Sequence, residues 1–89
     1  KINPNGMAGP GSLNNIAYSL VGAGNVDAGL EVLSAAVKLH PKEANLYDSI
    51  GEFHVKKGMK EKAVEFYRKA LEIDPNLESS KRAIQELTK

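Results

Sequence analysis

Cysteine and tryptophan are both absent from this chain of 89 residues. The absence of cysteine excludes disulfide bonds, thiolate metal sites and cysteine nucleophiles. The sequence also lacks any apolar run near the roughly 18 residues that a membrane-spanning helix requires. We therefore expect a fold held together by packing alone, with no transmembrane segment and no membrane partner.

Neither sign of charge is in excess, because 12 lysines and arginines balance 11 aspartates and glutamates. A nucleic-acid-binding domain usually has a strongly basic face, and attachment to an anionic membrane needs the same excess of positive charge. We therefore expect no nucleic acid among the partners. The apolar fraction of 42% is close to the globular average, which predicts a folded domain rather than a disordered chain.

The first residues differ in composition from the rest of the chain. Seven of these positions hold residues that interrupt regular structure: Asn3, Pro4, Asn5, Gly6, Gly9, Pro10 and Gly11. Such a concentration is typical of a loop, and we predict a flexible arm or linker over residues 1–11. The folded domain then covers residues 12–89, with Ser12 as the N-cap of its first helix.

The folded part repeats itself after 34 residues. Between the first repeat and the second, six identical pairs coincide: Ile16 with Ile50, Val21 with Val55, Gly24 with Gly58, Glu31 with Glu65, Ala36 with Ala70, and Pro41 with Pro75. A fixed period of this length indicates a stack of similar structural units. We place the first repeat at residues 10–43 and the second at residues 44–77.

Each repeat has the apolar spacing of two helices, and no alternation typical of a strand appears. Glycines at 22, 24 and 58 interrupt the pattern in the middle of each unit, and Pro41 and Pro75 follow its end. We predict an all-α fold with helix-turn-helix units at about residues 11–39 and 44–73. A last helix at about residues 77–88 has polar residues at Lys81 and Gln85, which suits the end of a stack.

The pattern resembles the tetratricopeptide repeat (TPR) family. The second unit carries the residues of that motif in order: Tyr47, Ile50, Gly51, His54, Ala63, Tyr67 and Pro75. The first unit matches less closely, with Leu13, Ile16, Ala17, Leu20, Gly29, Leu33 and Pro41. The resemblance implies a right-handed α-solenoid of two repeats and a capping helix. It also implies a scaffold for protein–protein interaction.

Small residues mark the places where the two helices of a unit approach closely. These are Ala17 in the first unit, and Gly51 and Ala63 in the second. Gly29 stands where the family pattern has alanine. We expect it to keep the close approach but to weaken its helix by about 1 kcal/mol relative to alanine.

No arrangement of side chains indicates catalysis. The two histidines, His40 and His54, have neither the neighbours of a catalytic triad nor the close spacing of a metal pair. We interpret His40 as a residue at a helix C-terminus, where it interacts favourably with the helix dipole. His54 takes the place of a buried tyrosine and is expected to be packed and hydrogen-bonded. We therefore predict that the domain is not an enzyme and needs no cofactor and no metal.

The resemblance implies a concave groove lined by the first helix of each unit, in which a peptide or partner protein lies. Removing the core positions leaves nine candidate groove residues: Asn14, Tyr18, Val21, Asn45, Asp48, Glu52, Val55, Lys56 and Arg82, with Glu86 beside them. The carboxylates of Asp48 and Glu52 would repel the free carboxylate of a chaperone C-terminus. A ligand with a basic or amide-rich segment and an apolar anchor fits better, with an affinity no tighter than micromolar.

Two stretches, Asn45–Glu52 and Ile16–Leu20, resemble the TPR tail found behind serine-hydrolase or β-lactamase-like domains of some bacterial proteins. This resemblance implies an alternative function as an accessory C-terminal domain of a larger enzyme. The end of the first repeat has no covering neighbour, so it would dock on the parent domain or associate with a second copy. We expect a soluble protein of the cytoplasm or of the bacterial periplasm.

Overall fold

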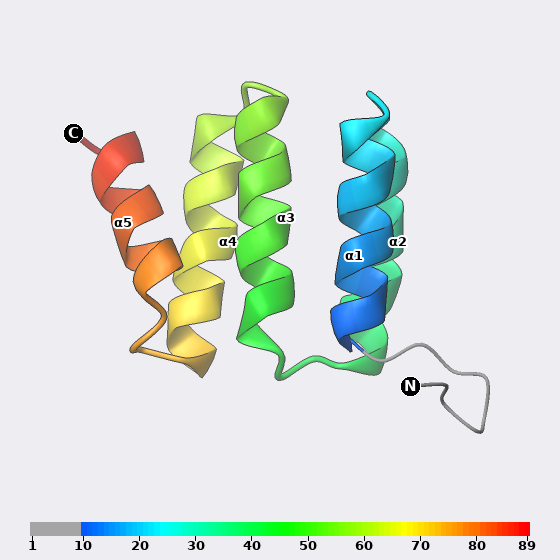
Figure 1. Ribbon diagram of the computed structural model, residues 1–89. Coiled ribbons are helices and arrows are strands. Elements are labelled where there is room, and N and C mark those ends of the chain that lie inside the picture. The colour runs from blue at the N-terminus through cyan, green and yellow to red at the C-terminus, as the bar shows by residue number, and fades with distance from the viewer. Residues whose placement is uncertain (1–9) are drawn as a thin grey trace.

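The computed structural model describes residues 10–89, and helices are the only regular elements over this range (Figure 1). They are α1 (Pro10–Gly22), α2 (Val26–Leu39), α3 (Ala44–Lys56), α4 (Lys60–Ile73) and α5 (Glu78–Leu87). The predicted all-α fold of two helix pairs and a final helix is therefore confirmed. The predicted outer limits of the two pairs and of the final helix differ from these bounds by at most one residue.

The start of α1 corrects two expectations. Pro10 and Gly11 lie in the first turn of α1, although their composition assigned them to the arm. Proline is favoured at the first position of a helix, because its fixed φ suits the helix and its missing N–H would have no partner there. Ser12 lies inside the helix and is therefore not its N-cap. The rest of the predicted arm, residues 1–9, lies outside the described residues.

The turns inside the two pairs are equivalent. Gly24 has φ of 93° and Gly58 has φ of 77°. An L-residue with a side chain is strained in this left-handed region, whereas glycine adopts it freely. Asn25 then caps α2, since its side chain accepts a hydrogen bond of 3.1 Å from the Ala28 amide.

The main core lies between α1, α2 and α3. Leu33, Leu46 and Phe53 are buried at its centre. Ala17 and Gly51 are also buried, as the motif predicts. The helices of each pair pack against each other, and α5 packs against α4 at the other end of the stack (Figure 1). The stack is elongated, with extents of 45, 29 and 19 Å.

Ile16 does not belong to this core, although its apolar spacing predicts a core position. It is 48% exposed, whereas Ile50 at the equivalent position is 3% exposed. Ile50 is covered because α3 packs against α2 of the preceding pair. Within the described residues no helix precedes α1, so the same position of the first repeat faces outward.

Candidate partner-binding face

The first helices of the repeats, α1 and α3, and the final helix α5 are joined by polar side chains. The Tyr18 hydroxyl on α1 donates a hydrogen bond of 2.7 Å to Glu52 Oε1 on α3. The Ser80 hydroxyl on α5 donates one of 2.6 Å to Asp48 Oδ1, one helical turn away from Glu52. Ser80 is fully buried, whereas Tyr18, Asp48 and Glu52 are partly exposed. The two bonds therefore join α1, α3 and α5 beneath one surface, which carries Tyr18, Asp48 and Glu52 and which we call the first-helix face.

Tyr18 is packed more tightly than the apolar spacing predicts, since that spacing leaves it outside the core. It is half-buried, and its ring meets Phe53 edge to face with centroids 4.9 Å apart at 77°. Burial is the largest cause that raises the pKa of Tyr18 to about 12. Ser49 acts in the opposite direction, and the Glu52 carboxylate adds to the rise because a tyrosinate beside it would be repelled. The hydroxyl therefore stays protonated and holds Glu52 in place.

Tyr67 reaches the same region from α4 and is not among the predicted site residues. It is 5% exposed, and a Cβ on Gly51 would lie 3.0 Å from three of its ring carbons. Burial raises the pKa of Tyr67, and the charges of Asp48 and Glu52 raise it further. The spacing of the motif marks Tyr67 only as a core residue. Gly51 is the sequence feature that could have placed Tyr67 near this face, because the absence of a side chain at Gly51 lets the Tyr67 ring approach α3.

The other predicted groove residues differ in their exposure to solvent. Val21 is half-buried against the core, and its Cγ2 would lie 2.7 Å from a Cβ on Gly29. Asn14 is also half-buried, and its Oδ1 is shielded from solvent without a hydrogen-bond partner. The remaining four are exposed: Asn45, Val55, Lys56 and Arg82. Glu86 is exposed as well and is paired with Lys89 at 3.5 Å.

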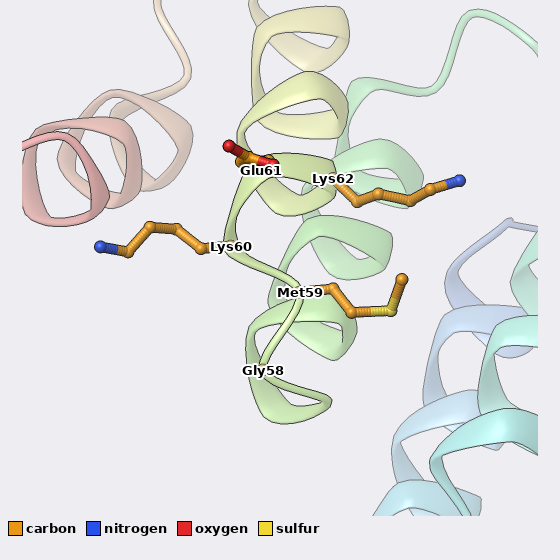
Figure 2. Close-up of a pocket in the computed structure, with 5 residues that line it drawn as sticks. All are labelled: Gly58, Met59, Lys60, Glu61 and Lys62. Atoms are coloured by element: carbon orange, nitrogen blue, oxygen red, sulfur yellow. The ribbon is translucent and has the colours of Figure 1, made fainter.

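A different surface, at the start of α4, has a hollow whose polar side chains do not point toward one place. The hollow measures about 450 Å³ and is lined by Gly58, Met59, Lys60, Glu61 and Lys62. Figure 2 shows that the side chains of Lys60 and Lys62 extend in opposite directions. All five lining residues are exposed. Since a binding pocket needs polar groups that converge on one point, we assign no site here.

Both histidines have structural roles in the helices. His54 is half-buried and hydrogen-bonded, because its Nδ1 lies 2.9 Å from the Ile50 carbonyl oxygen. His40 caps α2 through its backbone N–H, which donates to the Ala36 carbonyl, while its Nε2 is buried without a partner. Over residues 10–89 no group of three acidic, histidine or cysteine residues could hold a metal ion.

None of the five helices combines the length and the apolar character needed to cross a membrane, in the part of the chain that the structure describes.

The fold and the repeated turns define the class of this protein: it is a helical repeat protein, built from two helix pairs and a final helix. Residues 44–77, which hold α3 and α4, match the tetratricopeptide repeat family. Residues 44–77 thus form one repeat of the tetratricopeptide type within this helical repeat protein. No curated protein matches it. Tetratricopeptide repeats generally serve as non-catalytic scaffolds in protein–protein interaction.

Proposed function

We propose that the domain is a non-enzymatic interaction module that binds a segment of a partner protein along the first-helix face. The observation that carries this proposal is the pair of hydrogen bonds, Tyr18 to Glu52 and Ser80 to Asp48. They connect α1, α3 and α5 into one surface whose acidic groups are fixed before a partner arrives. Groups that are already ordered lose less conformational entropy on binding.

The charges on this face favour a basic or amide-rich segment. Each carboxylate uses one oxygen in its hydrogen bond, and the other oxygen remains available as an acceptor. Neither Asp48 nor Glu52 forms an ion pair within residues 10–89. A guanidinium or ammonium group of the partner would therefore meet uncompensated acceptors. A free C-terminal carboxylate, as in a chaperone tail, would be repelled.

Val55 supplies an apolar contact at the end of the same face. It lies on α3 near Lys56 and is 40% exposed. An extended segment with one basic residue and one apolar residue could therefore use both features. Since the face spans only two repeats and a final helix, we expect a Kd no tighter than about 1 μM, which is roughly −8 kcal/mol.

A peptide-display selection tests the proposal, because it requires no identified partner. Random peptides are selected on the wild-type domain, and the enriched sequences are measured by calorimetry. We expect enrichment of arginine or lysine, and loss of binding in the double variant Tyr18→Ala with Glu52→Lys.

Glu72→Lys is the matched control, because it reverses an exposed charge on α4 away from this face. It should retain binding. Circular dichroism identifies a variant that has failed to fold. Enriched peptides without basic residues, or equal binding by the folded double variant, would refute the assignment.

The exposed end of the first repeat favours a second candidate function. Ile16 on α1 and Leu39 on α2 are 48% and 57% exposed, which is unusual for large apolar residues in a repeat core. This surface could dock on a parent domain, as in the accessory tails of bacterial hydrolases that the sequence resembles, or on a second copy. Sedimentation equilibrium of the wild type and of Ile16→Lys distinguishes self-association, which the lysine should abolish, from a monomer.

A further inference from the structure

A second hollow lies on the other side of the stack, between α2 and α4, and does not involve the first-helix face. It measures about 420 Å³, which is within the range of small-molecule sites. Three helices contribute to its walls: Leu30, Ser34, Val37 and Lys38 from α2, Ile50 and His54 from α3, and Lys62 and Phe66 from α4.

The floor of this hollow is apolar and rigid. Ile50 is buried in the core, and Phe66 is partly buried against it. The His54 ring stacks on Phe66, with centroids 5.2 Å apart and an angle of 10° between the planes. The hydrogen bond from His54 Nδ1 to the Ile50 carbonyl oxygen fixes the orientation of the ring. A flat apolar group would therefore meet a surface that needs little rearrangement.

The rim is basic. Lys38 and Lys62 line the hollow from opposite helices, and no carboxylate is among its lining residues in the described part of the chain. Neither lysine forms an ion pair within residues 10–89. His54 Nδ1 must carry the hydrogen that the carbonyl oxygen accepts, so Nε2 remains for a further polar contact. The rim thus has no internal partner for its positive charge.

Residue 54 is smaller than the residue that the repeat pattern places there. That pattern has a tyrosine, and histidine lacks the outer part of the tyrosine ring and its hydroxyl. His54 therefore takes up less room in the wall of the hollow and carries ring nitrogen atoms instead of a phenol hydroxyl. The equivalent residue of the first repeat, 34 positions earlier, is Leu20, which offers no polar atom.

We propose that this hollow binds a small carboxylic acid with an aromatic or aliphatic body. The body lies on Leu30, Val37 and Phe66, which line the hollow and are only partly buried. The carboxylate lies between the Lys38 and Lys62 ammonium groups. Charge complementarity selects the acid, since the rim supplies two cations and no anion. Inorganic phosphate has no apolar body and makes no use of the floor. We therefore expect phosphate to bind more weakly than the carboxylic acid.

The test is an amide NMR titration of the isotope-labelled 89-residue chain with naphthylacetate. We expect shift changes at Ser34, Lys38, His54 and Phe66, with a Kd of about 1 mM for a ligand of this size. Naphthylacetamide, which has the same body without the charge, should bind at least about fivefold more weakly. Equal binding of acid and amide, or shifts that lie away from the hollow, would overturn the proposal.

Variants separate the role of the rim from that of the floor. Lys38→Gln and Lys62→Gln should each weaken binding of naphthylacetate by about threefold, whereas the exposed control Lys42→Gln should leave it unchanged. His54→Tyr should fill the space and abolish the shifts. If His54→Tyr does not fold, the lysine variants still decide the question. Unchanged affinity in both lysine variants would overturn the proposal.

Discussion

Tyr18 and Glu52 occupy the same position in successive repeats, 34 residues apart, and are joined by a hydrogen bond of 2.7 Å. One position in the motif therefore holds a donor in the first repeat and its acceptor in the second. The bond links α1 directly to α3, in addition to the apolar contacts that both helices make with α2. It also fixes one of the two carboxylates on the first-helix face.

Tyr18→Phe removes this hydrogen bond and keeps the edge contact with Phe53. We expect the free energy of unfolding to fall by about 0.5–1.5 kcal/mol, the usual net value of one hydrogen bond. Urea denaturation followed by circular dichroism measures the change. The reciprocal variant Glu52→Gln keeps an acceptor and should cost less. A Tyr18→Phe variant as stable as the wild type would show that the bond contributes nothing to the contact between α1 and α3.

Alkaline pH should weaken the fold through Tyr18. Its pKa is about 12 in the folded protein against 10.0 in the reference state, so the folded protein holds the proton more tightly. The resulting stabilisation is fully present below about pH 10 and is lost as the pH rises from 10 to 12. Denaturation across this range should show falling stability, and Tyr18→Phe should show a smaller fall. Ultraviolet absorbance of tyrosinate should place the Tyr18 titration above pH 10.

Gly29→Ala should destabilise the protein, although alanine favours a helix by about 1 kcal/mol. A Cβ at this position would lie 2.7 Å from Val21 Cγ2 and 3.0 Å from the Ala17 carbonyl oxygen. Because one of these neighbours is backbone, α1 and α2 must move apart, at an expected net cost of about 1–3 kcal/mol.

Gly22→Ala is the control for that substitution. Gly22 ends α1 and does not have a positive φ, and a Cβ on it would have no neighbouring atom within 4 Å. We expect a neutral or slightly stabilising effect of up to about 1 kcal/mol in thermal or chemical denaturation. If Gly29→Ala were as stable as Gly22→Ala, α1 and α2 would not approach each other at Gly29 as closely as the structure has it.

Ile16→Ala and Ile50→Ala should have very different effects on stability. Ile50 is 3% exposed, so its truncation leaves a cavity and should cost about 2–5 kcal/mol. Ile16 is 48% exposed, so its truncation should lower the free energy of unfolding by well under half of that amount. Paired denaturation curves at low protein concentration measure the difference. Equal costs would mean that a second copy or another segment covers α1 in solution.

The period of the sequence predicted the architecture because each unit places its small and apolar residues at the same distances. Gly24 and Gly58, one period apart, show this directly, since both have the positive φ of the turn. Periodicity alone could not show which equivalent positions are covered. Ile16 and Ile50 have the same local pattern, and only the presence of α2 beside α3 makes one of them a core residue.

The candidate site was predictable in its helices but not in its contacts. Spacing placed Tyr18, Asp48 and Glu52 on the first helices, whereas the hydrogen bonds depend on how neighbouring repeats are rotated and on side-chain conformations. Gly29 shows the same limit. Helix propensity predicted a loss relative to alanine, but the distance to the Ala17 carbonyl oxygen is a tertiary property that no local pattern contains.

The most direct test of the first-helix face is an amide NMR map of the domain with the strongest peptide from the display selection. We expect the largest shift changes on α1 and α3, at Tyr18, Asp48, Glu52 and Val55. Replacing the basic residue of the peptide by alanine should remove most of them. Shift changes centred on Ile16 and Leu39, with none at Asp48 or Glu52, would instead assign binding to the exposed end of the first repeat.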